Sequence, residues 1–300
     1  MTLRPDFPAV IDNSMRSCFK QCPRKFQLEY LEHWRPNILS IHLHAGICFA
    51  HGVETVRRAF YVDGLPPDDA LAKGWTALVE EFGQYDVDAT EVKTVDRMAS
   101  ALVYYFTVFP LGSDFIAPLQ LANGERVFEF SFTEAIDVAH PVTGQPILYY
   151  GRFDMLGQHA NGDLYVTDEK TAKQLGASWV KGWSLDAQMT GYCWGARRFD
   201  FPVSGALIRG ISILKNGHGH AQSIQTRSAW EIERWYGQLC RDVESMKRMW
   251  AEGYFDYDLA GGCKSYGGCG FLSACKSPEP ERWLEVDFTR RIYAPWLGTF

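Results

Sequence analysis

Residues 147–170 read ILYYGRFDMLGQHANGDLYVTDEK and contain two runs typical of β-strands. Ala160-Asn161-Gly162 separates the runs, and Asn-Gly between such runs favours a β-hairpin. A loop centred on Asn161 places Asp154 opposite Asp168, with their side chains about 5 Å apart on one face. A strict two-residue Asn-Gly loop shifts the pairing by one position and moves Asp168 to the other face, unless a bulge restores it.

The hairpin carries a group of charged residues that fits metal and phosphate chemistry. Two close carboxylates repel each other unless a cation lies between them. Lys170 follows Asp168 by two residues and therefore shares its face of the strand. The sequence thus predicts a site for a hard divalent metal ion and a phosphoryl group, built on Asp154, Asp168 and Lys170.

Helical and strand patterns alternate around the hairpin, which predicts an α/β protein. Helices are expected over 14–33, 45–61, 68–83, 91–108, 182–199 and 228–252, and further strands over 127–138, 204–214 and 221–226. Pro23 suits the first turn of a helical piece, where its missing N–H costs nothing.

Composition excludes several classes of protein. The chain has 300 residues and 46% apolar residues, enough for one large domain or two small ones. It has no uninterrupted run of 18 apolar residues and no apolar segment in its first residues, so we expect a cytoplasmic protein without a membrane span or secretory signal. A net charge of −6 argues against a generally basic nucleic-acid coat, but a local basic groove or bound metal can still serve a nucleic-acid enzyme.

Four motifs follow one another along the chain: His51, Gly151-Arg152-Phe153-Asp154, Asp168-Glu169-Lys170-Thr171, and Gln188-x-x-x-Tyr192. In this order the chain resembles the PD-(D/E)XK nuclease superfamily, in particular RecB-type nuclease domains and the related CRISPR-associated exonucleases. The resemblance extends over residues 14–276. It implies a restriction-endonuclease-like core, a mixed sheet flanked by helices, within a single domain 1–300. That domain would comprise a helical part (about 14–110), a nuclease core (about 125–255) and a cysteine-rich tail (about 260–276).

The resemblance also implies roles for individual residues. Asp154, Asp168, His51 and the main-chain carbonyl of Glu169 would hold Mg²⁺ or Mn²⁺, and the imidazole suits Mn²⁺ better. Lys170 would orient or help to deprotonate the attacking water, or stabilise developing charge. Gln188 and Tyr192, one helical turn apart, would contact the nucleic-acid strand.

The function expected from the resemblance is metal-dependent DNA cleavage by an exonuclease acting on single-stranded ends. Recombination, DNA repair, CRISPR adaptation or phage replication could each supply its partners. Two alternatives stay open: an endonuclease, and a non-catalytic nucleic-acid-binding module of nuclease-like fold. The chain contains no G-x-x-x-x-G-K-[ST] helicase motif, so we expect a stand-alone nuclease or a subunit.

Five of the eight cysteines fall into two short segments, Cys18 and Cys22 near the start and Cys263, Cys269 and Cys275 in the tail. Without a secretory signal, a metal or cluster site is a better interpretation than disulfides. Iron–sulfur members of the resembled group place a Cys directly before Pro near the N-terminus, which favours Cys22. We therefore expect a [4Fe–4S] cluster on Cys22, Cys263, Cys269 and Cys275. The x₅ gaps depart from the group's usual C-x-x-C spacing, so zinc on the same four residues, or free thiols, remain alternatives.

Other charged residues near these motifs receive no role from the sequence. Glu54 shares a helical face with His51, and Glu129 lies on the preceding strand. Arg57-Arg58 is interpreted as part of a solvated helix face.

Overall fold

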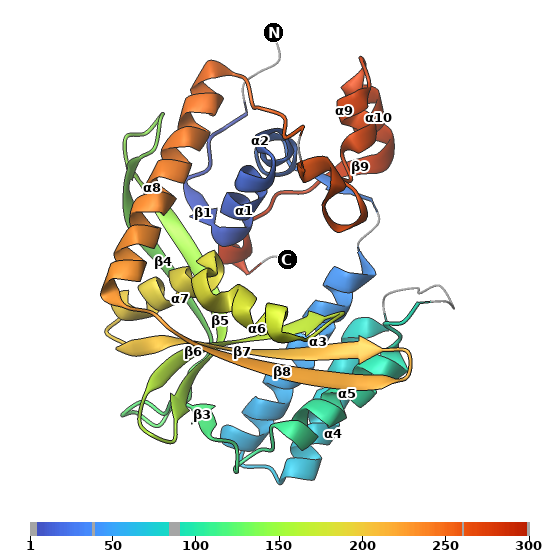
Figure 1. Cartoon of the computed structure of the whole chain (residues 1–300), viewed down its shortest axis with the longest axis vertical. Helices are drawn as coiled ribbons and strands as arrows, with labels where there is room; N and C mark the ends of the chain where they lie inside the picture. Colours follow the sequence, from blue (N-terminus) through green and yellow to red (C-terminus); the bar gives the residue numbers. More distant parts are fainter. Residues whose placement is uncertain (1–4, 38–39, 84–90, 260, 299–300) are drawn as a thin grey trace. The chain divides into compact units, whose positions relative to one another are not determined.

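The computed structural model describes residues 5–37, 40–83, 91–259 and 261–298, and the chain divides into two compact units (Figure 1). Unit 1 comprises Met1–Ile38, Ser131–Gly151 and Glu233–Phe300, and unit 2 comprises Leu39–Phe130 and Arg152–Ile232. Both units combine segments that lie far apart in the sequence. Neither coincides with the helical part, core or tail expected above, and the single-domain organisation stays a prediction.

Helices and strands alternate along the described residues, as expected. The helices are α1 Asn13–Gln21, α2 Pro23–Phe26, the π-helix η1 Gln27–Leu31, α3 Ile41–Tyr61, α4 Pro67–Phe82, α5 Val95–Val108, α6 Ala177–Gly182, η2 Trp183–Leu185, α7 Ala187–Arg198, α8 Ala229–Glu252, η3 Gly262–Gly267, α9 Leu272–Lys276, α10 Pro280–Asp287 and η4 Pro295–Leu297. The strands are β1 Val10–Asp12, β2 Trp34–Pro36, β3 Ile116–Pro118, β4 Phe128–Ala139, β5 Pro146–His159, β6 Leu164–Ala172, β7 Val203–Leu214, β8 Gly217–Thr226 and β9 Phe288–Arg290.

Most long elements match their predicted ranges within a few residues. The helix predicted over 182–199 begins only at Ala187, the helical segment 14–33 is divided into α1, α2 and η1, and β8 begins earlier than expected. Leu214 of β7 pairs with Gly217, so the turn contains only Lys215 and Asn216. Strand β8 therefore begins at Gly217, before the predicted residue 221. The three-residue strands were not predicted, because so few residues carry no hydrophobic alternation of their own.

Seven strands of the described chain form one mixed sheet, and β5 passes through both units. Within unit 2, β5 pairs antiparallel with β3 and β6, β6 runs parallel to β7, and β7 runs antiparallel to β8. This mixed sheet with flanking helices confirms the expected restriction-endonuclease-like α/β core.

Helices cover both faces of the unit 2 sheet (Figure 1). Ile211 and Ile213 of β7 join the apolar cluster formed by α3, α4 and α5 on one face. Gly210, between Arg209 and Ile211, faces the opposite side, where a Cβ atom would lie 2.7 Å from the Trp179 ring of α6. Alternate residues of the central strands therefore face different helical layers.

Helix α3 packs closely on α4 because apolar residues recur on one side of it. Phe49, Val53 and Val56 are buried there with the apolar residues of α4 and α5. A Cβ atom on Gly74 of α4 would lie 2.2 Å from Cγ2 of Val56 and 2.6 Å from the carbonyl oxygen of Gly52. A side chain at position 74 would separate the helices, so this contact requires glycine.

Unit 1 contains the parallel pair of β1 with Leu148–Tyr150 of β5. Asp12 ends β1 and caps α1, because its Oδ1 accepts a 2.8 Å hydrogen bond from the N–H of Met15. Arg16 of α1 and Asp242 of α8 form a buried ion pair at 2.7 Å. Among the described residues, none of the helices combines the length and apolar character that crossing a lipid bilayer demands.

Candidate active site

The β5–β6 hairpin has the register that a loop centred on Asn161 predicts. Met155 pairs with Thr167, and the N–H of His159 donates to the carbonyl of Asp163 at 2.8 Å. Gly162 closes this loop with φ +95°, a conformation that glycine adopts without strain. The one-residue shift of a strict Asn-Gly turn does not occur. Asp154, just before Met155, and Asp168, just after Thr167, therefore lie one position beyond the last pair of the ladder.

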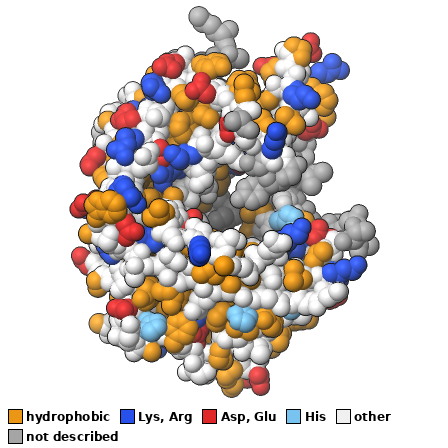
Figure 2. Space-filling model, in the orientation of Figure 1, with side chains coloured by type: hydrophobic (Ala, Val, Ile, Leu, Met, Phe, Trp, Pro, Cys, Tyr) orange, Lys and Arg blue, Asp and Glu red, His pale blue; other side chains and the backbone are white. Residues whose placement is uncertain are grey.

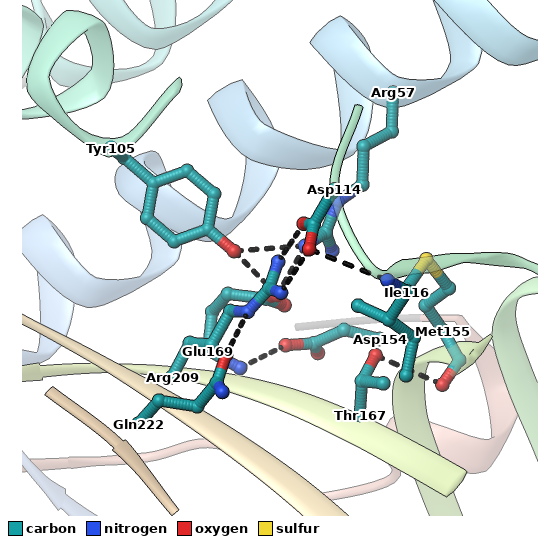
Figure 3. Close-up of polar contacts among 10 residues, drawn as sticks. All are labelled: Arg57, Tyr105, Asp114, Ile116, Asp154, Met155, Thr167, Glu169, Arg209 and Gln222. Carbon is teal, nitrogen blue, oxygen red and sulfur yellow. Dashed lines mark hydrogen bonds and ion pairs between the residues drawn. The ribbon is translucent and has the colours of Figure 1, made fainter. Parts of the chain in front are cut away.

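At this end of the ladder a side chain replaces a main-chain partner. Oδ2 of Asp154 accepts a 2.8 Å hydrogen bond from the N–H of Glu169 (Figure 3). Asp168 is buried, and its Oδ2 has an ion pair with Lys170 but no hydrogen bond among the described residues. The ammonium of Lys170 therefore serves as the counter-ion that two neighbouring carboxylates require.

Burial and mutual repulsion disfavour the charged forms of both aspartates. Burial, followed by the charges of Asp168 and Glu169, raises the pKa of Asp154 well above its usual value. Burial also raises the pKa of Asp168, although Lys170 opposes the shift. The pKa of Lys170 is raised, because Asp168 and Asp154 outweigh the effect of its burial. The pair carries an excess of negative charge that a divalent cation would relieve.

Helix α7 presents its N-terminus beside this group. Asp186 caps the helix by accepting the N–H of Met189 at 2.9 Å, and its charge acts on both Asp168 and Lys170. Gln188 is half-buried and donates to the hydroxyl of Tyr192 at 2.9 Å. Tyr192 is buried, with its ring 5.8 Å from that of Phe153. Helix α7 thus places Gln188 and Tyr192, which are predicted to contact the nucleic-acid strand, beside β5.

His51 is exposed on α3, and its role as a metal ligand stays a prediction. No group of three or more His, Cys, Asp or Glu side chains in the described part of the chain is arranged to hold a metal ion. The structure brings together Asp154, Asp168, Glu169 and Lys170.

The pattern of these residues also matches a known family. The family model of the PD-(D/E)XK nuclease superfamily matches residues 14–276. The chain belongs to the PD-(D/E)XK nuclease superfamily. It is therefore a nuclease, a hydrolase of phosphodiester bonds whose substrate is a nucleic acid.

Comparison with solved structures supports the same fold. A protein from Eubacterium rectale named "Putative exonuclease" is similar, with a TM-score of 0.50 and 11% identity over 85% of this chain and 87% of that one. The structure of SSO0001 matches 67% of this chain and 74% of that one at 14% identity, but its TM-score of 0.29 carries no weight. No sequence among the curated proteins matches this chain.

PD-(D/E)XK nucleases typically use Mg²⁺ or Mn²⁺, and the donors present in this chain fit such an ion. Asp154 and Asp168 supply carboxylate oxygens, and the Glu169 carbonyl lies on the same strand edge. Hard divalent cations prefer oxygen donors of this kind. Oδ2 of Asp168 is buried and faces the Lys170 ammonium, whose place a metal cation could take.

A further carboxylate near Asp154 and Asp168, Glu129 of β4, received no role from the sequence. It forms a 3.2 Å ion pair with Arg152, and its φ of +47° is unusual for a residue other than glycine. Burial, opposed by Arg152 and reinforced by Glu54, raises its pKa to about 7. Its charge also acts on Asp154, so it belongs electrostatically to the same group.

A buried network on the other face of β6 was missed by the sequence reasoning. Glu169 meets Arg57 and Tyr105 there, and Arg209 donates to both carboxylate oxygens of Asp114 (Figure 3). The interpretation of Arg57 as part of a solvated helix face is wrong for this residue and correct for exposed Arg58. Helical spacing could have indicated that Arg57 is buried, because Arg57 follows Phe49, Val53 and Val56 on the apolar side of α3.

The cysteines predicted to hold a cluster all lie in unit 1. The charges of Cys22, Cys263 and Cys269 act on Cys275, and those of Cys22 and Cys263 act on Cys269. All four thiols are free of disulfide bonds. Cys269 and Cys275 pack beside the apolar cluster of Leu28, Phe271, Ala274, Leu284 and Phe288. The donor set fits a soft metal or an iron–sulfur cluster, although the thiols do not form a closed ligand set.

Proposed function

We propose that the chain is a metal-dependent deoxyribonuclease that removes nucleotides from single-stranded DNA ends and carries a structural [4Fe–4S] cluster. The observation that carries the nuclease site is the placement of Asp154 beside the Glu169 N–H at the end of the β5–β6 ladder, with Asp168 and Lys170 next to it. Carboxylates, a main-chain carbonyl and a lysine thereby meet at one strand edge.

A bound Mg²⁺ or Mn²⁺ ion would supply Lewis-acid polarisation of the scissile phosphate and acidify a water molecule. Asp154, Asp168 and the Glu169 carbonyl would hold the ion. Lys170, displaced from Asp168, would keep its positive charge next to the developing phosphate charge. Lys170 is 31% exposed in its side chain, so its ammonium can reach a substrate from solvent.

The surface charges favour attraction of nucleic acid at the site itself over attraction by the surface as a whole. On the face drawn in Figure 2, Lys and Arg side chains alternate with Asp and Glu side chains, and the net charge is −6. Substrate binding would therefore depend on the bound cation and Lys170. Trp179 and Trp183, which form a T-shaped pair 5.3 Å apart beside the sheet, would stack unpaired bases.

The cluster assignment requires a choice between Cys18 and Cys22 as the N-terminal ligand. Cys18 is buried and donates to Oε2 of Glu29 at 3.8 Å. Burial and the charge of Glu29 raise its pKa, which disfavours the thiolate that a metal ligand requires. Burial also raises the pKa of Cys275, although Arg24 opposes the shift. The contact of Cys18 with Glu29, and the action of the Cys22 charge on Cys269 and Cys275, favour Cys22 with Cys263, Cys269 and Cys275; zinc on the same residues remains the alternative outcome.

An assay with end-labelled and circular substrates tests this function. Purified full-length protein is incubated with Mg²⁺ or Mn²⁺ and linear single-stranded DNA, linear duplex, circular single-stranded DNA or RNA. Release of short labelled products from linear single strands, with circles left intact, is expected. Cleavage of circles would instead establish an endonuclease. Binding without metal-dependent products would identify a non-catalytic module.

A further inference from the structure

Glu169 lies between Asp168 and Lys170 in sequence, but its side chain points to the opposite face of β6. There Nη2 of Arg57 donates to Glu169 Oε1 at 2.5 Å, and the hydroxyl of Tyr105 donates to the same oxygen at 3.0 Å (Figure 3). Arg57 also donates to the Tyr105 hydroxyl at 2.8 Å. Donors from α3 and α5 therefore hold one carboxylate from two directions.

The ion pair is buried to an unusual degree. The side chains of Arg57 and Glu169 are 6% and 2% exposed. Burying two charges is costly, and apolar residues of similar volume often stabilise a fold equally well. The packing of α3 on the sheet therefore does not by itself explain why charged residues occupy positions 57 and 169. What an arginine–carboxylate pair adds to apolar packing is a fixed direction for the carboxylate.

That direction is transmitted to the main chain of the site. The N–H and C=O of one strand residue point to the same side, toward the neighbouring strand. The N–H of Glu169 points at Oδ2 of Asp154, at 2.8 Å, so its carbonyl also points toward β5. Glu169 is thus fixed at its carboxylate by Arg57 and at its N–H by Asp154. A rotation of this residue would move both the Asp154 carboxylate and the Glu169 carbonyl.

We propose that Arg57 is a positioning residue of the nuclease site, which acts through Glu169 to hold the Asp154 carboxylate and the Glu169 carbonyl in place for a divalent cation. The inference rests on the proposed function, since it concerns the metal ligands named there. Arg57 contacts neither of those ligand atoms itself. Its effect is therefore on the affinity for the cation, and saturating cation should compensate for its loss.

Mn²⁺ binding to the full-length protein without nucleic acid provides the test. Free Mn²⁺ is measured by electron paramagnetic resonance during titration of wild type, Arg57→Lys and Arg16→Lys. Arg57→Lys keeps the charge but loses the planar fork, and should weaken Mn²⁺ binding about tenfold or more. Arg16→Lys is the matched control, because Arg16 is similarly buried in an ion pair, with Asp242 of unit 1. It should change the affinity by less than about twofold.

Activity provides a second reading of the same variants. Excess Mn²⁺ should restore most of the cleavage rate of Arg57→Lys, which a general structural defect would not permit. Tyr105→Phe removes only the hydroxyl donor, so it remains informative if Arg57→Lys does not fold. It should weaken Mn²⁺ binding about threefold or more, the effect of one lost hydrogen bond.

The outcomes separate this inference from the proposed function. Unchanged Mn²⁺ affinity in Arg57→Lys and Tyr105→Phe overturns it, and so does equal weakening in Arg57→Lys and Arg16→Lys. If the wild type binds no Mn²⁺, or binds only Mn²⁺ that Asp168→Asn leaves in place, the metal site itself is wrong and both proposals fail. Asp168-dependent binding that is insensitive to Arg57 leaves the nuclease site intact and refutes the positioning role alone.

Discussion

The N–H of Glu169 donates to Oδ2 of Asp154 at 2.8 Å, just beyond Met155 and Thr167, the last pair of the β5–β6 ladder. A carboxylate here takes the place of a main-chain acceptor. Beyond Met155 and Thr167 the facing edges of β5 and β6 are no longer paired with each other, and Asp168 and Lys170 lie in this part of β6. Both main-chain and side-chain oxygens are thereby available to a cation.

Asp154→Asn and Asp168→Asn should each abolish metal-dependent cleavage, because each removes a negative ligand oxygen. The fold should persist, since asparagine can still accept the Glu169 N–H. Burial raises the pKa of both aspartates, reinforced by Asp168 and Glu169 at Asp154 and opposed by Lys170 at Asp168. The metal-free variants should therefore be as stable as wild type or slightly more stable, above all at pH 8. Thermal unfolding and a labelled-DNA assay measure both effects. Asp163→Asn, in the same hairpin, is the control, and wild-type turnover in either site variant would exclude the site.

Lys170→Ala should retain binding of Mn²⁺ and DNA but lose at least about a hundredfold in cleavage rate, because its charge acts on the transition state. Removing the ammonium leaves Asp168 without its counter-ion, so the metal-free variant should also be less stable and regain stability with Mn²⁺. Single-turnover kinetics and DNA-binding titrations separate the two steps. Lys173→Ala, exposed just beyond β6, should behave as wild type. A loss confined to DNA affinity would mean that Lys170 merely contacts a phosphate.

Glu129 should make the stability of the metal-free protein fall with rising pH. Its pKa is raised to about 7, so between its unfolded pKa near 4.5 and pH 7 the native state holds a proton that the unfolded state releases. The stabilising contribution is therefore complete below the unfolded pKa and lost as pH rises through about 7. Glu129→Gln should gain on the order of 2 kcal/mol relative to wild type between pH 5 and pH 8.5. Urea unfolding at both pH values measures this; parallel pH profiles in the two proteins would contradict the shift.

Anaerobically purified protein should be brown, with absorbance on the order of 400 nm, and should contain iron and sulfide. Ala at Cys22, Cys263, Cys269 or Cys275 should remove the colour and lower the melting temperature. The reason is that ligation links residue 22 to a segment 241 residues later, which restricts the unfolded chain. Activity should fall only indirectly, because the carboxylates lie in unit 2.

Cys18→Ala and Cys193→Ala are the matched controls for the cluster and should keep both colour and stability. Colourless protein with one zinc ion per chain would replace the iron–sulfur assignment but retain the four-cysteine site. Loss of the cluster in Cys18→Ala, with Cys22→Ala unaffected, would show that Cys18 is the N-terminal ligand.

The sequence by itself determined the features that depend on neighbours along the chain. The Asn161-Gly162 turn and the alternation around it predicted the hairpin. A loop centred on Asn161, one of the two registers that the sequence left open, places Asp154 and Asp168 one position beyond the last pair. The helical and strand patterns gave most elements and the α/β class. The order of His51, Asp154, Asp168 and Lys170 was enough to reach the superfamily that the family comparison identifies.

Only the tertiary structure decided which distant residues meet. Arg57 and Glu169 are 112 residues apart, and Asp114 and Arg209 are 95 apart, so no local pattern specifies either pair. Burial of Arg57 and exposure of His51 likewise depend on how α3 packs against α4, α5 and the sheet. A side chain's partner follows from the folded surface it faces, since charges are buried only where another element supplies the opposite charge. The hairpin is encoded in its own residues, whereas the network that orients it exists only after the helices have closed over β6.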